Sequence, residues 1–178
     1  MKYQAPALLA RHHQLEDFAC RSDEQTEWLL RHARQSAAAG FTRVFVTTPI
    51  GSQAVAAYYA WTMAHIEAAD APLRLLKGSG RYPQPVALLA RLGVHIKHEG
   101  HGLGAALLKD VIRRAAAISD HIDCRGLLVH AESEAARNFY QHLVPEFETS
   151  PTDDLHLLLL LKDIKRTLAD SGRKQDSN

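Results

Sequence analysis

The middle of the chain reads Glu99-Gly100-His101-Gly102-Leu103-Gly104-Ala105-Ala106-Leu107-Leu108, a glycine-rich turn that runs directly into an apolar helix. Glycines at alternate positions leave out the Cβ atoms that would keep a phosphorylated ligand away from the backbone. The helix that follows presents unpaired N–H groups and the positive end of its dipole to an anion. The stretch therefore predicts a cradle for the pyrophosphate of a coenzyme, although the same spacing also suits a plain tight turn that begins a helix.

The composition limits the classes of protein to which this chain can belong. Its 178 residues, 46% of them hydrophobic, suffice for one substantial core, so we expect one domain over 1–168 and a polar tail over 169–178. A net charge of +1 argues against a global attraction to nucleic acid and leaves only local basic patches. Two cysteines, without a metal-binding spacing, fit reduced thiols. Because the sequence has no signal-peptide core and no run of ~18 apolar residues, we expect a cytoplasmic protein without a membrane span.

The first half of the chain has clear local patterns. Ser22, with Gln25 three residues later, is a capping box that predicts a helix as far as Gly40. The β-rich runs 44–46 and 54–59 flank a Pro-Ile-Gly-Ser turn and predict an antiparallel hairpin. The stretch from about 67 to 85 is punctuated by proline and glycine and predicts a long loop.

The second half alternates strands and helices. We expect a central strand over 86–94, in which Gly93 indicates a bulge or a close backbone approach by a ligand. After the apolar helix that begins at Leu103, the chain predicts a strand over 127–129, a helix over 135–140 and a strand over 155–161. This order predicts an α/β arrangement on a mixed sheet. It differs from a dinucleotide-binding fold, in which the glycine turn follows the first strand.

At this point the chain resembles the GCN5-related N-acetyltransferase (GNAT) superfamily. That family carries the acetyl-coenzyme A motif Gln/Arg-x-x-Gly-x-Gly/Ala at the end of a splayed central strand, and here the motif runs from Glu99 to Gly104. Glu99 departs from the motif, because a carboxylate stands where the family has an amide or a guanidinium. The resemblance implies an α/β (α+β) fold with a mixed, mostly antiparallel sheet, a splayed central strand and flanking helices.

A closer resemblance covers nearly the whole chain and is to the acetyltransferase toxins of bacterial type II toxin–antitoxin pairs. These toxins acetylate the α-amine of aminoacyl-tRNA and so block translation. One departure is Pro145, which stands where such toxins have an aromatic-Gly-Phe turn. The resemblance implies acetyl-coenzyme A as co-substrate, aminoacyl-tRNA as substrate, a homodimer and a small ribbon-helix-helix antitoxin. The segments that carry it are 28–33 ahead of 40–41, 57–60, 89–94, 128–131 ahead of 135–140, and 150–157.

The resemblance also implies which residues form the site. It makes Val94 the residue whose main-chain N–H orients the thioester oxygen, and it puts Tyr140 near the coenzyme sulfur. It implies coenzyme contacts for the end of the central strand, the glycine turn and one further helix residue. These are Leu92, Val94, Glu99, Gly100, His101, Gly102, Leu103, Gly104, Ala105 and Asn138.

Tyr140 has two interpretations. By spacing alone, Phe139 and Tyr140 lie on an apolar helical segment and resemble core aromatics. The resemblance instead makes Tyr140 the general acid toward the leaving thiolate. A phenol near pKa ~10 and a thiol near ~8.5 make complete proton transfer uphill by roughly 2 kcal/mol. A strong hydrogen bond to the thiolate is therefore as good a description as protonation.

No carboxylate stands out as a general base. An α-amine near pKa ~8 is roughly one-tenth neutral at pH 7, whereas a lysine near ~10.4 is neutral only at about one part in a few thousand. An α-amino substrate therefore needs less help, which weakly favours aminoacyl-tRNA. Glu99, Glu132 or Glu134 acting through water stay open as bases.

Contacts to RNA phosphates would come from lysine and arginine side chains of the long loop and around the turn. Any single surface cation is more often solvated than bound to a ligand, and Lys97 has the alternative of lying over coenzyme phosphates. With so little net charge, RNA binding should weaken steeply with salt. The candidates are Arg74, Lys77, Arg81, Arg91 and Lys97.

A metal site is not expected. His95, His98 and His101 straddle a strand end and a turn, so they share no face, and no further ligand set completes a coordination sphere. Cys124, at the start of a strand, is a small buried residue in this interpretation and not a nucleophile.

The leading hypothesis is a toxin-type N-acetyltransferase that uses acetyl-coenzyme A to acetylate aminoacyl-tRNA. The alternatives are a GNAT acetyltransferase acting on a small-molecule amine or a protein N-terminus, and a non-catalytic acyl-coenzyme A-binding module. In the last case Glu99 and Pro145 would mark lost activity.

Overall fold

The computed structural model describes residues 2–166 and 168, so the predicted tail 169–178 lies outside the described residues. The chain divides into two compact units. The described residues of Met1–Thr62 and Leu89–Val111 form the first unit, and those of Met63–Leu88 and Ile112–Asn178 form the second. Three elements contribute residues to both units: β3 (Ala57–Ile66), β4 (Gln84–Val94) and α4 (Leu103–Ile118).

In the first unit the strands follow the order β1 (Ala7–Leu8), β2 (Arg43–Thr47), β3 and β4. The β1–β2 and β2–β3 pairs are antiparallel, which confirms the predicted hairpin. Phe45 lies opposite Tyr59 in this ladder, and their rings stack with centroids 5.1 Å apart. The two exposed residues of β1 carry no apolar alternation, so the sequence pattern did not indicate this strand.

The capping box at Ser22 begins a helix as predicted. The Ser22 hydroxyl accepts a hydrogen bond from the backbone N–H of Gln25 at 3.1 Å. The helix is divided at His32 into α1 (Asp23–Arg31) and α2 (Ala33–Ala38), and α2 ends before Gly40. No glycine or proline lies at the division, so no residue type signalled it.

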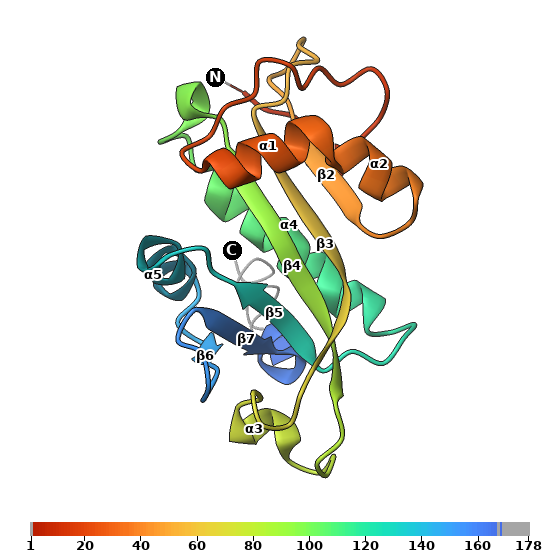
Figure 1. Cartoon of the computed structure of the whole chain (residues 1–178), viewed down its shortest axis with the longest axis vertical. Coiled ribbons are helices and arrows are strands. Elements are labelled where there is room, and N and C mark those ends of the chain that lie inside the picture. The colour runs from red at the N-terminus through yellow and green to blue at the C-terminus, as the bar shows by residue number, and fades with distance from the viewer. Residues whose placement is uncertain (1, 167, 169–178) are drawn as a thin grey trace, which may run out of the picture. The chain divides into compact units, whose positions relative to one another are not determined.

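Two successive tyrosines of β3 fix helices to opposite faces of the first unit's strands, since neighbouring side chains in a strand point opposite ways. The Tyr58 hydroxyl donates to the backbone oxygen of Gln25 in α1 at 2.6 Å. The Tyr59 hydroxyl donates to Asp110 of α4 at 2.6 Å. Figure 1 shows α1 in front of these strands and α4 behind them. The core on the α1 side comprises Leu15, Phe18, Leu29, Ala33, Val44, Val46, Val55, Tyr58 and Ala60.

The close approach to the Gly93 backbone exists, and a side chain of the core makes it. A Cβ atom on Gly93 would lie 2.8 Å from Cε1 of Tyr58, which is closer than real Cβ contacts. The Tyr58 ring is fully buried between Trp28 and Phe18, so it has no room to move away. Gly93 is therefore required by core packing, and a ligand contact of its backbone stays a prediction.

In the second unit the strand order is β3, β4, β5 (Gly126–His130), β7 (His156–Leu160) and β6 (Glu148–Thr149). β7 pairs antiparallel with both β5 and β6. The predicted later helix is confirmed as α5 (Glu134–Leu143). The predicted loop 67–85 also contains the short α3 (Leu73–Leu76) and the first residues of β4. The core of this unit comprises Ile66, Ala71, Leu75, Val86, Leu128, Leu158 and Leu160.

Both cysteines are free thiols that serve local structure. The Cys124 Sγ is buried and donates to the backbone oxygen of Gly126 at 3.3 Å. The half-buried Cys20 Sγ donates to the backbone oxygen of Ser22 at 3.2 Å. Within residues 2–166 and 168, no helix has the length and apolar character needed to cross a membrane.

Candidate functional site

The glycine turn joins β4, through the short 3-10 helix η1 (Ile96–His98), to the start of α4. Gly100 and Gly102 have φ angles of +73° and +75°, a left-handed conformation that other residues adopt only with strain. No atom lies within 4 Å of the position that a Cβ would take at either glycine. The turn therefore leaves open space beside its backbone.

The start of α4 leaves backbone donors at that open space. The hydrogen bond from the Ala106 N–H to the Gly102 oxygen, at 3.0 Å, is the first of the helical pattern. The N–H groups of Leu103, Gly104 and Ala105 consequently have no acceptor within the helix. A helix of 16 residues adds its positive dipole end at the same place. The turn thus has the open space and the free backbone donors that a pyrophosphate needs, and the contact itself stays a prediction.

The other predicted coenzyme contacts of the first unit lie on the same connection. Leu92 and Val94 are half-buried near the end of β4. Leu103 is 6% exposed, so its side chain is packed inside the protein. The exposed His101 has its Nδ1 2.9 Å from the backbone oxygen of Glu99 and 3.3 Å from that of His98.

Glu99 has a partner that sequence reasoning missed. Arg21, from the segment before α1, donates from Nε to Oε1 at 2.9 Å and from Nη2 to Oε2 at 2.8 Å. The hydrogen bonds and positive charge of Arg21 lower the pKa of the Glu99 carboxyl below its ordinary value. The residues are 78 positions apart, so no local pattern could have signalled the pair.

The histidines near the turn are tied to protein groups. His95 Nδ1 accepts from the Lys97 N–H at 3.0 Å, and its Nε2 lies 3.0 Å from the backbone oxygen of Asp17. This pairing requires a neutral ring with the proton on Nε2. His98 Nδ1 lies 3.0 Å from the Tyr3 hydroxyl, and burial lowers the pKa of the His98 imidazole. Among the described residues, no three potential ligands come together in a metal-binding group.

Tyr140 and Asn138 belong to the second unit, both on α5. Asn138 is exposed, whereas Tyr140 is 7% exposed and contacts the rings of Phe139 and Phe147. Burial raises the pKa of the Tyr140 phenol far above its ordinary value, and the Glu132 carboxylate raises it further. The hydroxyl therefore stays protonated and can only act as a donor or neutral acceptor at physiological pH.

The second unit also contains a histidine pair that sequence reasoning missed. His130 and His156 face each other across the β5–β7 ladder, and their rings stack with centroids 3.8 Å apart. Burial, followed by the neighbouring His156, lowers the pKa of the His130 imidazole. His156 Nε2 lies 3.5 Å from Asp153. Only the strand register brings these rings together, and register cannot be read from either strand alone.

The predicted RNA-binding cations fall into two groups. Arg74 contacts Glu148 and donates to the buried Asp163, so it links α3 to residues that follow it far along the chain. Arg91 pairs with Glu24 at 3.1 Å and lies over the Trp28 ring. The remaining three are exposed, and none has a carboxylate partner in the described part of the chain. These are Lys77, Arg81 and Lys97.

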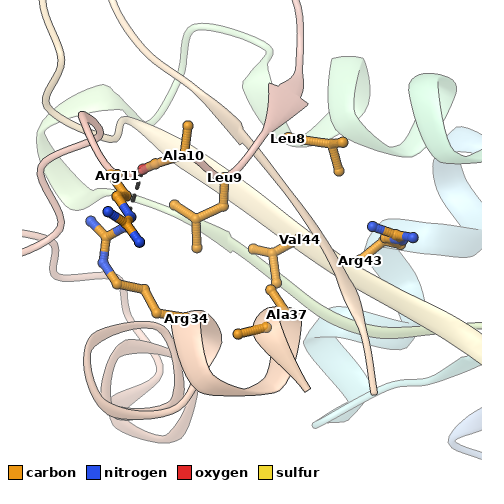
Figure 2. Close-up of a pocket in the computed structure, with 9 residues that line it drawn as sticks. Leu8, Leu9, Ala10, Arg11, Arg34, Ala37, Arg43 and Val44 are labelled. Carbon is orange, nitrogen blue, oxygen red and sulfur yellow. Dashed lines mark hydrogen bonds between the residues drawn. The ribbon is translucent and has the colours of Figure 1, made fainter. Parts of the chain in front are cut away.

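A separate pocket of about 410 Å³ lies between β1, β2 and α2 in the first unit. Figure 2 shows Arg11, Arg34 and Arg43 around the apolar side chains of Leu9 and Val44. Arg34 is held there, because its Nη1 donates to the backbone oxygen of Ala10 at 3.1 Å. None of the predicted site residues lines this pocket, so it is distinct from the glycine turn.

Solved structures with this fold include two bacterial toxins. A tyrosine-to-phenylalanine variant of KacT matches with a TM-score of 0.86 at 20% identity, over 94% of this chain and 99% of that chain. AtaT in complex with acetyl-methionyl-tRNAfMet matches with a TM-score of 0.85 at 21% identity, with the same coverage. These similarities confirm the predicted fold class of a sheet flanked by helices.

Sequence comparison identifies the family. A tRNA-acetylating toxin of Mycobacterium tuberculosis (strain ATCC 25618 / H37Rv) is 38% identical over 168 residues, which are 94% of this chain and 98% of that relative. The model of the acetyltransferase (GNAT) family matches residues 17–143, a span that contains the glycine turn and Tyr140. The chain therefore belongs to the acetyltransferase (GNAT) family.

Proposed function

We propose that the protein transfers an acetyl group from acetyl-coenzyme A to the α-amine of aminoacyl-tRNA and thereby blocks translation. The observation that carries this proposal is the 38% identity to a tRNA-acetylating toxin across 94% of the chain. A relationship of that length includes every candidate site residue, not only a coenzyme motif. The open backbone at Gly100 and Gly102 supports the coenzyme part independently.

The coenzyme contacts are assigned to backbone groups where the side chains are small or buried. The pyrophosphate lies on the N–H groups that begin α4, from Leu103 to Ala105. The N–H of Val94 orients the thioester oxygen, and Leu92 precedes it along the pantetheine arm. His101 lies beside the phosphates, and Asn138 on α5 is a further coenzyme contact.

In the reaction, the lone pair of the neutral α-amine attacks the thioester carbon, so a C–N bond forms while the C–S bond breaks. The electron pair of that bond leaves on sulfur, and the amine gives its surplus proton to water. The Tyr140 hydroxyl donates a hydrogen bond to the developing thiolate. Because burial raises the pKa of Tyr140, full proton transfer to sulfur is even less favourable than between free groups, which favours a hydrogen bond over protonation.

Lys77, Arg81 and Lys97 are the proposed phosphate contacts for tRNA. They are exposed and have no carboxylate partner within the described residues. Arg74 and Arg91 are less suited, because each already holds a carboxylate of this chain. Since net charge is small, the affinity for tRNA should depend on these local contacts and fall steeply with salt.

The proposed setting is that of a toxin–antitoxin pair in the cytoplasm. AtaT has been solved with the C-terminus of the antitoxin AtaR, and a KacTA complex has been solved with DNA. For this chain we accordingly expect a homodimer that a small ribbon-helix-helix antitoxin neutralises. The molar mass in solution, measured by light scattering, tests the dimer independently of any activity assay.

The test is transfer of radiolabelled acetyl from acetyl-coenzyme A to total aminoacyl-tRNA, beside deacylated tRNA and a mixture of small amines and peptides. Label that appears in aminoacyl-tRNA, and is released with the amino acid by mild base, supports the proposal. Label only in small amines or peptides favours an ordinary acetyltransferase of the same fold. Coenzyme binding without transfer to any acceptor favours a non-catalytic acyl-coenzyme A-binding module.

A further inference from the structure

Glu99 puts a negative charge directly beside the turn that is to receive a pyrophosphate. Building on the proposed coenzyme site, we propose that Arg21 is a positioning residue of that site, which cancels the charge of Glu99 and holds its carboxylate fixed. Together, Arg21 and Glu99 carry no net charge, so they present no net negative charge to the pyrophosphate. The single neutral or basic side chain of the family motif meets the same requirement at this position.

The contact between the two side chains is close and multiple. Arg21 Nε lies 2.9 Å and 3.0 Å from the two carboxylate oxygens of Glu99, and Nη2 lies 2.8 Å from one of them. This fork geometry uses both oxygens of the carboxylate. Among the described residues, Arg21 alone forms a salt bridge with Glu99. The next residue, Gly100, begins the open backbone, so the charge of Glu99 lies at the edge of the anion cradle.

The backbone around Arg21 is anchored to the same connection. The Ile96 N–H donates to the Ala19 oxygen at 2.9 Å, which ties the segment before α1 to the first residue of η1. The Cys20 N–H donates to Thr26 Oγ1 at 3.0 Å, so the next residue is fixed to α1. Arg21 follows these two anchored residues and precedes Ser22, whose hydroxyl caps α1, so its approach to Glu99 is built into the fold.

An unpaired carboxylate at this position would repel the coenzyme. The pyrophosphate carries negative charge, and like charges a few ångströms apart in a mostly aqueous setting alter an affinity by about five- to tenfold. Arg21 has a side chain that is 84% exposed, so it contributes little to the core. Its removal should weaken coenzyme binding without unfolding the protein.

The experiment is a double-variant cycle on acetyl-coenzyme A affinity, measured by isothermal titration calorimetry. We expect Arg21→Ala to raise the Kd about fivefold. Glu99→Gln, which restores an amide, should bind as tightly as the natural protein or more tightly. The double variant Arg21→Ala/Glu99→Gln should return to within about twofold of the natural protein, because the charge that Arg21 cancels is gone.

The control variant is Arg31→Ala, which breaks another exposed ion pair of the first unit, with Glu27 at 2.9 Å. It should leave the Kd unchanged. Higher salt should narrow the gap between Arg21→Ala and the natural protein, because salt screens the exposed Glu99 charge.

Several outcomes would overturn the inference. If the double variant binds as weakly as Arg21→Ala, Arg21 contacts the phosphates itself and does not act through Glu99. If Arg21→Ala binds like the natural protein, the pair has no role in the coenzyme site. If the natural protein does not bind acetyl-coenzyme A at all, the proposed function is refuted and this inference falls with it. That result is distinguishable from the two above, in which the natural protein binds the coenzyme.

Discussion

Arg21 in the first unit and Arg74 in the second unit make the same kind of contact in opposite surroundings. Each guanidinium holds carboxylates that are distant along the chain. The partner of Arg21 is Glu99, whose side chain is 31% exposed, whereas Arg74 holds Asp163, whose side chain is 2% exposed. Loss of the first pair leaves a carboxylate that water can solvate, and loss of the second leaves a buried one.

The difference in exposure gives the two ion pairs different roles, one in stability and one in ligand binding. A buried carboxylate without partners is costly, so the network around Asp163 is a requirement of the fold. An exposed pair has little effect on stability but still sets the local charge that a ligand meets. The contrast predicts that polar groups of the coenzyme turn can be changed at the expense of binding alone.

The largest expected effect concerns Tyr140, the proposed hydrogen-bond donor to the leaving thiolate. Tyr140 is 7% exposed, and its ring packs against Phe139 and Phe147. Tyr140→Phe should lower kcat for acetyl transfer about 100-fold, because one donor to the developing charge is lost. The Kd for acetyl-coenzyme A and the Tm of this variant should equal those of the natural protein. Full turnover in this variant would remove Tyr140 from the mechanism.

The contrast between the two arginine partners is tested directly by stability. Asp163→Ala should lower the free energy of unfolding by about 2 kcal/mol, since it removes the charged acceptor of both Arg74 and Arg166. Glu99→Ala should leave the urea midpoint unchanged, because that carboxylate is accessible to water. Chemical denaturation of both variants measures the difference. Equal losses would show that exposure does not distinguish the two networks.

The smallest expected effect is a shift in the pKa of the Glu99 carboxyl. Because Arg21 lowers the pKa of Glu99, its carboxyl should titrate below the ordinary value of 4.5. The stabilisation from this pair is present above the pKa of the unfolded chain and is lost as pH falls through the lowered folded value. Carbon-13 NMR of the side-chain carboxyl measures it. In Arg21→Ala the midpoint should return toward 4.5, and an unmoved midpoint would mean that another group lowers it.

Most of the fold could be predicted from local patterns. The capping box at Ser22, the hairpin of β2 and β3, and the glycine turn before α4 each rest on residues close together in sequence. The division of the helix at His32 had no such signal, and β1 was too short to show alternation.

The candidate site was only partly predictable for the same reason. The glycines of the turn could be recognised in the sequence, because backbone positions with positive φ angles strongly favour glycine. Gly93 was identified as special, but the Tyr58 ring that requires it is distant in the chain. Likewise, Arg21 meets Glu99 only through tertiary contacts, and the single sequence contains no record of that pairing.

Both compact units are assembled from separated pieces of chain, and this has a consequence for biosynthesis. The first unit needs Leu89–Val111 to complete it, so it cannot finish folding on the ribosome until Val111 has emerged. A product terminated after β3 would have an open strand edge where β4 should pair, and it would lack the glycine turn altogether. Early stop codons should therefore produce fragments that aggregate or are degraded by proteases, and not small active domains.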